Sequence, residues 1–239
     1  MNPRHLFVDS RMTGLCAYCG GDPETRDHVP SKILLDDPLP VDLPTVDACA
    51  KCNGSFSLDE EYVACFLDCV ISGTCKPESV SRQKVSRALS RNPQLMARMA
   101  DSCRINEEGI QTWVPDDSRL RNIVLKLARG HVNYELSLTL VEEPNLVYAE
   151  PFILMSEFDV SKFEQGNMID SRLFPEVGSR SFLRKLGSRP YDRNPGPWIV
   201  VQEGRYRYSV EQTDGVIVRI VLSEYLACLV KWQFDRNED

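Results

Sequence analysis

Histidine is scarce in this 239-residue sequence, which has only His5, His28 and His131. Long apolar runs are missing as well, and none approaches the roughly 18–20 residues that a membrane-spanning helix needs. The first residues, MNPRHLFVDSRM, lack the apolar core of a signal peptide. With 42% hydrophobic and 26% charged residues, the composition is typical of a globular protein. We therefore expect a cytoplasmic protein with no membrane partner.

Several common catalytic motifs are also missing. The sequence has no phosphate-cradling P-loop, no dinucleotide-binding glycine fingerprint and no Ser-His-Asp motif. Zinc deaminases combine His-x-Glu with Pro-Cys-x-x-Cys. Here His28 is followed by Val29 and Pro30, and Ala48 precedes Cys49. These differences argue against deaminase, nucleotide-binding and serine-hydrolase chemistry.

The overall charge is acidic, but two segments are basic. The net charge of −7 and the pI of about 5.1 count against a nucleic-acid binder, although binding depends on local patches. Taken alone, each basic segment is typical of a solvated helix face. Residues 76–104 hold Lys76, Arg82, Lys84, Arg87, Arg91, Arg98 and Arg104 against two acids, and residues 180–193 hold Arg180, Arg184, Lys185, Arg189 and Arg193 against one.

Cysteine, in contrast, is abundant, with nine residues. Without a secretion signal we expect no disulfide framework. Five cysteines are scattered and are expected to act as small buried hydrophobes; they are Cys65, Cys69, Cys75, Cys103 and Cys228. The other four form two Cys-x-x-Cys pairs with 29 residues between them, and they are Cys16, Cys19, Cys49 and Cys52.

Two such pairs suit a four-thiolate zinc site, with an iron–sulfur cluster as the rival interpretation. Gly20 and Gly21 follow one pair and Asn53-Gly54 follows the other, and both are turn signals. Four cysteines leave no open coordination position, so the zinc would be structural. It would join two segments about 30 residues apart.

The segment between the pairs predicts a short strand at 26–29, stopped by Pro30, and a second strand at 43–48. Apolar residues then recur at helical spacing from Phe56 to Val70. Ser57 and Glu60 fit a capping box, so we expect the regular helix to start at Ser57 after an irregular turn.

Three motifs in this order resemble the zinc-stapled branch of the HNH endonuclease family. They are Cys16-x-x-Cys19, Asp27-His28-x-Pro30 and Cys49-x-x-Cys52-Asn53, and the resemblance covers about residues 14–70. It implies a ββα-metal fold and metal-dependent hydrolysis of phosphodiesters. It also implies that His28 is the general base and that Asp27 and Asn53 ligate a catalytic Mg²⁺ or Mn²⁺.

The chemistry of these residues suits those roles. An unperturbed histidine titrates near pH 6.5, so part of it can accept a proton at neutral pH. Carboxylate and amide oxygens are hard donors that suit Mg²⁺ or Mn²⁺. Neighbouring side chains of a strand point to opposite faces, so Asp27 and His28 serve one phosphate only at the strand's edge or on a twisted strand. The alternatives are a surface turn for Asp27-His28 and a simple turn residue for Asn53.

The sequence departs from the family pattern at two places. The usual Asn-Leu pair near the second strand is absent, and either Thr45 or Asp47 could replace its asparagine. The lysine common after Cys-Asn is also absent, and Asp59 and Glu60 lie there instead. These acids either complement the helix dipole or contact the metal site. His5 and His131 have no partner at motif spacing and are expected to be structural.

The remaining residues predict helices followed by strands. Residues 76–105 predict one or two helices broken near Asn92-Pro93, and residues 117–132 predict an amphipathic helix. Strands are expected at 138–143, 197–202, 206–212 and 215–225, with a hairpin at Asp214-Gly215, while 223–232 is either helix or strand.

The sequence thus predicts an α+β protein with an HNH module at 1–75 and a helical, then β-rich domain at 76–239 for substrate selection or oligomerisation. The expected function is metal-dependent cleavage of DNA, or of RNA, in bacterial defence against foreign DNA. The alternatives are a catalytically silent zinc-binding module that recruits nucleic acid or protein, and a zinc scaffold for an interaction domain. A homo-oligomer or a partner protein is compatible with each.

Overall fold

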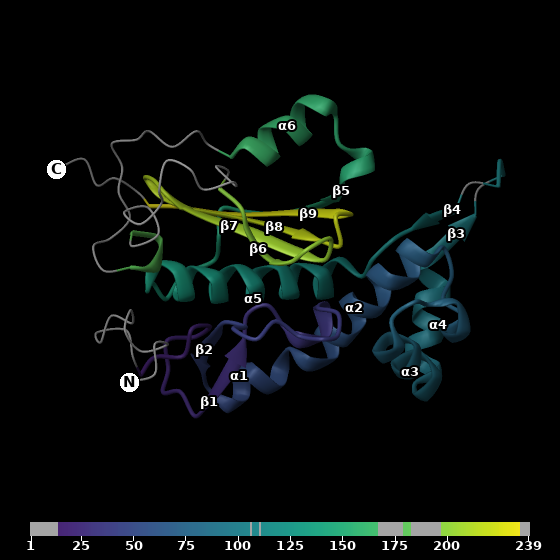
Figure 1. Ribbon diagram of the computed structural model, residues 1–239, viewed down its shortest axis with the longest axis horizontal. Helices are drawn as coiled ribbons and strands as arrows, with labels where there is room; N and C mark the ends of the chain where they lie inside the picture. Colours follow the sequence, from purple (N-terminus) through teal and green to yellow (C-terminus); the bar gives the residue numbers. More distant parts are fainter. Residues whose placement is uncertain (1–13, 106, 110, 167–178, 183–196, 235–239) are drawn as a thin grey trace.

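The computed structural model describes residues 14–105, 107–109, 111–166, 179–182 and 197–234, which form a mixed α+β fold (Figure 1). The helices are α1 Ala50–Ser55, α2 Ser57–Ser72, α3 Gln83–Arg91, α4 Pro93–Ser102, α5 Asp117–Leu136 and α6 Glu157–Gln165. The strands are β1 Thr25–His28, β2 Thr45–Ala48, β3 Cys103–Ile105, β4 Gln111–Trp113, β5 Leu146–Pro151, β6 Ile199–Gln202, β7 Tyr206–Gln212, β8 Gly215–Leu222 and β9 Leu226–Gln233. Short 3₁₀ turns are η2 Lys32–Leu34, η3 Pro77–Ser79 and η4 Phe152–Leu154.

The N-terminal part is an antiparallel β1–β2 pair followed by two helices. His28 lies opposite Thr45, and Thr25 lies opposite Ala48. The expected strands at 26–29 and 43–48 are confirmed with shifted ends. The capping box is wrong: α2 has no side-chain cap, and the Ser57 hydroxyl donates to the Gly54 carbonyl instead. The irregular turn expected before Ser57 is the six-residue helix α1.

The C-terminal part is one antiparallel sheet with the strand order β5-β9-β8-β7-β6. The expected hairpin is confirmed, because β7 pairs with β8 across Thr213 and Asp214. Residues 223–232, left open between helix and strand, contribute most of β9. Every residue of β8 is buried, because α5 covers one face of the sheet and α6 lies over the other (Figure 1).

The strand expected at 138–143 is wrong, because this segment is irregular and the next strand, β5, begins only at Leu146. The reason lies in the carbonyl groups of that segment. Arg129 donates to the carbonyls of Val141 and Glu142, and the Trp232 indole donates to Glu142. Side chains therefore satisfy backbone acceptors that a neighbouring strand would otherwise need.

Helix α5 lies between the β1–β2 and α2 region and the large sheet (Figure 1). It is longer than expected, and twelve of its twenty residues are buried. Its apolar residues share one core cluster with α2 and with strands β7, β8 and β9. The sequence boundary between 75 and 76 therefore separates segments that contribute to the same hydrophobic core.

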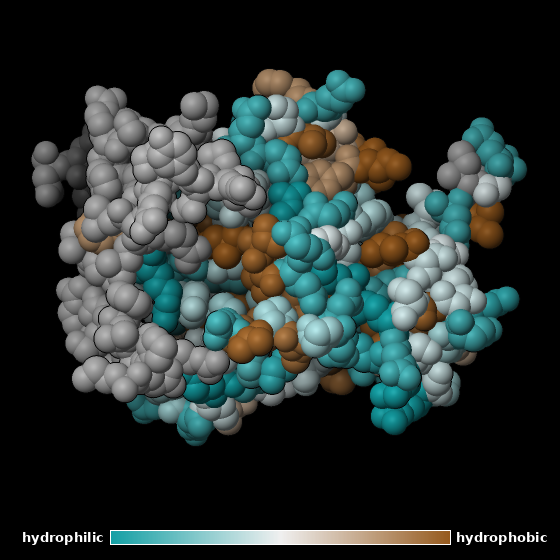
Figure 2. Space-filling model, in the orientation of Figure 1, coloured by the Kyte–Doolittle hydropathy of each residue, from teal (hydrophilic) through white to brown (hydrophobic). Residues whose placement is uncertain are grey.

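The basic segment 76–104 forms a helical pair that projects at one end of the molecule (Figure 1). As expected, it breaks at Asn92-Pro93, where the Asn92 side chain accepts from the Leu95 amide and caps α4. Figure 2 shows hydrophilic surface along this end and an apolar patch where η4 and α6 lie. Ile153, Leu154 and Phe158 are exposed in that second region.

A buried ionic network joins the N-terminal part to the sheet. The carboxylate of Asp68, on α2, accepts from Arg205 at 2.6 Å and from Arg82 at 3.2 Å. Arg82 also donates to the carbonyls of Ile33 and Leu35, and Arg205 donates to Leu34. Asp36 lies 2.8 Å from Arg82 and 3.6 Å from Arg205 but is half-exposed, so Asp68, which is 3% exposed, is the buried carboxylate between the two guanidinium groups. Within the described residues, no helix is both long enough and apolar enough to cross a membrane.

Replacing Asp68 by alanine should lower the free energy of unfolding by about 3 kcal/mol, because it leaves two buried guanidinium groups with only the half-exposed Asp36 as an acidic partner. Urea unfolding measures the effect. The matched control is Arg121→Ala, which removes an exposed pair with Glu143 and should cost less than about 1 kcal/mol. Equal destabilisation by the two variants would contradict the network's role.

Candidate metal centre and adjoining charged cluster

The four cysteines of the two pairs converge on one point. Their sulfur atoms all lie within 4.8 Å of one another, and Cys19 and Cys49 are 3.8 Å apart. A tetrahedral ion with Zn–S bonds of about 2.3 Å requires sulfurs about 3.8 Å apart. The geometry of this cluster therefore fits a metal such as zinc, and it is the one such group among the described His, Cys, Asp and Glu side chains.

Local backbone structure brings the sulfurs together. Around the first pair, the Gly20 amide donates to the Cys16 carbonyl and the Cys16 amide to Gly21, closing a tight turn. Gly20 has φ +73°, a left-handed conformation that glycine adopts without strain. In the second pair Cys49 is the N-cap of α1, and its sulfur accepts from the Cys52 amide.

The pKa values of the cysteine thiols indicate that a cation would stabilise their ionised forms. Burial opposes ionisation of Cys16, but hydrogen bonds from the backbone of Cys49, Tyr18 and Cys19 lower its pKa to about 7. Burial and the neighbouring Cys49 sulfur raise the pKa of Cys52. The four groups cannot all ionise together without a positive charge between them, and a bound metal supplies that charge.

The first cysteine turn also carries Tyr18, which reaches the expected catalytic strand. The Tyr18 hydroxyl donates to Oδ2 of Asp27 at 2.7 Å. The ring packs edge-on against Phe56, which lies between α1 and α2. Closing the first turn therefore also fixes one oxygen of the Asp27 carboxylate.

Asp27 belongs to a cluster of charges drawn from three elements. The Lys126 ammonium, from α5, lies 2.8 Å from Oδ2 of Asp27 and also contacts Glu60 of α2. Lys126 donates to the Ser31 hydroxyl as well, at 2.8 Å. Asp27 is 9% exposed, and no hydrogen bond from the described residues reaches its other oxygen, Oδ1.

His28 lies on the opposite face of the strand from Asp27. Arg26, on the same face as His28, binds Thr45 and Asp47. The imidazole is half-buried and has no hydrogen-bond partner among the described residues. Burial lowers the pKa of His28, and the charge of Lys32 lowers it further. The neutral, proton-accepting form therefore prevails at pH 7.

Asn53 lies on the Asp27 face. Its amide nitrogen donates to the Thr25 hydroxyl at 3.1 Å, and Thr25 is two residues before Asp27 on β1. Side chains two apart on a strand share a face and are spaced about 6.6 Å along it. The Asn53 oxygen accepts no hydrogen bond from the described residues. Asp27 and Asn53 thus share one side of the hairpin, and His28 lies on the other.

Of the residues found where the sequence differs from the HNH pattern, only Glu60 contacts the charged cluster around Asp27. Thr45 and Asp47 both bind Arg26, and among the described side chains no hydrogen bond joins either to the His28 imidazole. Asp59 is held by Arg119 and Asn122 of α5, at 2.6 and 2.8 Å. Glu60, in contrast, belongs to the cluster around Lys126, so the helix-dipole interpretation does not describe its main contact.

Sequence reasoning missed Tyr18, Ser31 and Lys126. Only Tyr18 carried a local signal, because an aromatic residue inside a cysteine turn is placed next to the metal. Lys126 is 95 residues from Ser31 in sequence. The sequence predicted its helix from the apolar residues of one face, and those residues give no sign of a partner for Lys126. Its side chain is 1% exposed, and a lysine buried to that degree needs partners.

Helix α5 approaches the strand closely because Gly130 has no side chain. A Cβ at that position would lie 2.6 Å from Val29, the residue after His28. This close contact brings Lys126, one helical turn earlier, to Asp27. His131, the next residue, is fully buried, hydrogen-bonded to Tyr206 and stacked on Tyr208, so it is structural as expected. His5 lies outside the described residues.

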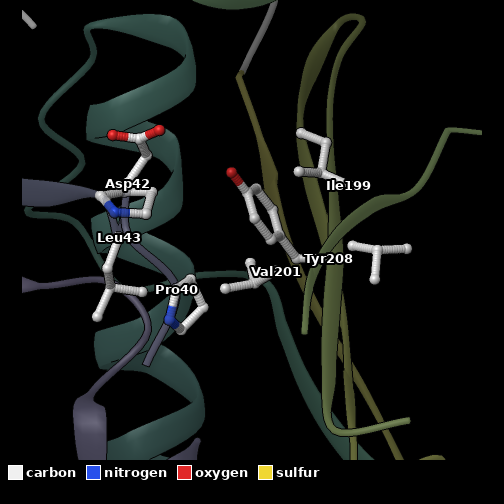
Figure 3. A pocket seen from close by; sticks show the side chains of 8 residues that line it. Pro40, Asp42, Leu43, Ile199, Val201 and Tyr208 are labelled. Atoms are coloured by element: carbon white, nitrogen blue, oxygen red, sulfur yellow. The ribbon is translucent and has the colours of Figure 1, made fainter. Parts of the chain in front are cut away.

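A separate pocket of about 230 Å³ lies between the loop at 40–44 and strands β6 and β7 (Figure 3). The Tyr208 ring and Val201 face Pro40 and Leu43, and Ile199 lies on the far side of the ring (Figure 3). Asp42 is its one titratable acid, and no cysteine or histidine lines it. This lining offers apolar contact and little catalytic chemistry.

Replacing Cys49 by serine should remove the bound zinc and unfold the hairpin region, because three thiolates hold zinc less well and the two turns separate. Elemental analysis should find about one zinc per chain in the unaltered protein. Cys75→Ser, outside the cluster, is the control and should keep its zinc. Retention of zinc by Cys49→Ser would exclude the four-sulfur site.

The chain was compared with protein-family models, curated proteins and solved structures, and none of them matches it. Its function is therefore inferred from the geometry of the site.

Proposed function

We propose that this chain is a divalent-metal-dependent endonuclease of the HNH type that hydrolyses phosphodiester bonds of DNA. One observation carries the proposal. Tyr18 and Lys126 fix one carboxylate oxygen of Asp27, and within the part of the chain that the structure describes neither the other oxygen nor the side chain of the adjacent His28 has a hydrogen-bond partner. The four-cysteine cluster supports this arrangement through Tyr18.

The available donor atoms suit Mg²⁺ or Mn²⁺. Oδ1 of Asp27 and the amide oxygen of Asn53 are both hard ligands on the same side of the hairpin, and neither accepts a hydrogen bond from the described residues. Hydrogen bonds to the second oxygen of a ligating carboxylate orient the first, and here Tyr18 and Lys126 make them. The bound ion would supply Lewis-acid stabilisation of the phosphate and the leaving 3′ oxygen.

His28 supplies the proton acceptor. Its neutral imidazole takes a proton from the attacking water, a contribution typically worth about 10²–10⁴ in rate. Because His28 and Asp27 project from opposite faces of β1, the scissile phosphate must lie at the end of the strand, beside Val29. The position of His28 as the last residue of β1 supports this placement.

The projecting basic helices offer a surface for the DNA backbone. Their exposed guanidinium groups have no ion-pair partner among the described residues, and they are Arg87 and Arg91 of α3, Arg98 of α4 and Arg104 of β3. Such contacts are independent of sequence and weaken with salt. In the second basic segment, Arg180 binds the Tyr134 carbonyl, and Arg184, Lys185, Arg189 and Arg193 lie outside the described residues.

One observation favours a second candidate, a catalytically silent zinc module that binds nucleic acid. The Lys126 ammonium already neutralises part of the charge of Asp27 and Glu60. A protein that never binds a divalent ion could retain this arrangement for stability alone. The exposed apolar residues near α6 suit either a second copy or a partner protein in both cases. A role in defence against foreign DNA stays a proposal that follows from the family resemblance.

Incubated with supercoiled plasmid and Mg²⁺ or Mn²⁺, the protein should nick DNA, and His28→Ala and Asp27→Asn should each lower the rate at least about 100-fold. Asp22→Asn is the matched control, an exposed acid in the preceding loop that should leave the rate unchanged. EDTA should stop cleavage and excess Mg²⁺ restore it, which separates the catalytic ion from zinc. A mobility shift without nicking would instead identify the silent binder.

In a His28→Ala background, replacing Arg87, Arg91 and Arg98 together by alanine should weaken duplex binding equally for different sequences. The slope of log affinity against log salt should fall by about 2.7, since each lost phosphate contact removes about 0.9. Arg26→Ala and Arg121→Ala, which alter arginines already paired with carboxylates, are the controls. An unchanged salt slope in the triple variant would place the DNA on another surface.

A further inference from the structure

Lys126 contributes a fixed positive charge where the proposed function requires a metal to bind. Its side chain is 1% exposed, and its three ammonium protons face three acceptors, Asp27, Ser31 and Glu60. The ammonium also lies 5.4 Å from the centre of the Phe56 ring and 6.0 Å from that of Tyr18. Any rotation of the Lys126 side chain would break some of these contacts, so the contacts hold the ammonium group in place.

The charges of the cluster do not cancel. Asp27 and Glu60 carry two negative charges and Lys126 one positive charge, which leaves a net charge of −1. A divalent ion on Oδ1 of Asp27 would overcompensate this charge and would lie close to the ammonium. Charges repel strongly at such separations when they are shielded from water. The protein alone therefore offers a weak divalent site.

A phosphodiester changes this balance. Each phosphate at the site adds one negative charge and oxygen ligands for a hard cation. With the phosphate present, the ion, the ammonium and the three anions are neutral together. Binding of the ion and of the nucleic acid should therefore favour each other, and thermodynamic linkage requires that the two effects be equal.

We propose that Lys126 acts as a resident cation of the Asp27–Glu60 pair and makes loading of the divalent ion depend on a bound phosphodiester. The proposal rests on the proposed function, because it concerns the same metal and the same substrate class. Lys126 is a positioning residue, since it acts through Asp27 and Glu60. Helix α5 thereby joins the site although it lies outside the segment that carries the cysteines and Asp27.

Binding of Mn²⁺, followed by the paramagnetic resonance of the free ion, tests the proposal on the full zinc-loaded chain. A His28→Ala background prevents cleavage, and a double-stranded oligonucleotide serves as the phosphodiester. With Lys126 present, the oligonucleotide should tighten Mn²⁺ binding by about tenfold or more, within the usual range of coupling between sites. Lys126→Met should bind Mn²⁺ about tenfold more tightly without DNA and lose most of the coupling. Lys162→Met, on α6, is the control and should behave as the parent.

Equal Mn²⁺ affinity in the parent and in zinc-loaded Lys126→Met would overturn the proposal. If Lys126→Met loses zinc or fails to fold, Glu60→Gln decides, because it keeps the ammonium and removes a negative charge. Glu60→Gln should bind Mn²⁺ at least about tenfold more weakly without DNA, and unchanged or tighter binding would overturn the proposal.

Plasmid cleavage separates failure of the Lys126 proposal from failure of the proposed nuclease function. Nicking with equal Mn²⁺ affinities overturns the role of Lys126 alone. If the Mn²⁺ affinities are as expected but the plasmid is not nicked, only the proposed hydrolysis is overturned. If neither the parent nor any variant binds Mn²⁺, both proposals are overturned.

Discussion

The convergence of four cysteine sulfurs is the constraint on which the N-terminal part depends. Two turns 30 residues apart in sequence, each with few apolar residues, are brought within 4.8 Å at their sulfurs. The small cluster around them contains Val29, Val46 and Ala48 and offers little apolar area. A metal held by the four sulfurs would add the stability that this cluster lacks. The same constraint places Tyr18 against Asp27, so the structural centre and the proposed catalytic residue are one hydrogen bond apart.

Helix α5 connects this part to the rest of the chain through polar contacts as well as through the shared core. Arg119 and Asn122 hold Asp59, and Lys126 holds Glu60 and Asp27. Loss of one partner is costly for a buried charge such as Lys126, so its contacts with Asp27 and Glu60 favour this position of the helix. Gly130 permits the approach, and the buried Asp68 network secures the sheet to the same helical layer. The 76–239 segment, which was expected to serve substrate selection or oligomerisation, therefore also supplies a residue to the charged cluster.

The sequence predicted what depends on short spacing and missed what depends on long-range contact. The Cys-x-x-Cys pairs, the Asp214 hairpin and the break at Asn92-Pro93 each follow from a few neighbouring residues, and each is present. Residues 138–143 have strand-like composition, yet Arg129 and Trp232 bind their carbonyls and no strand forms. Ser57 and Glu60 have capping-box spacing, but Lys126 takes Glu60. Nothing near position 126 in sequence indicates that partner, because the contact exists only once α5 lies against β1.

The central claim is that the sulfur cluster presents Asp27 as a metal ligand beside His28. The most direct test is anomalous diffraction from crystals of the His28→Ala variant grown with zinc, Mn²⁺ and a bound oligonucleotide. The two metals can be told apart because they have different absorption edges. The account predicts a zinc peak among Cys16, Cys19, Cys49 and Cys52 and a separate manganese peak in coordination distance of Oδ1 of Asp27, next to a phosphate. A zinc peak with no manganese at Asp27, and DNA bound elsewhere, would contradict it.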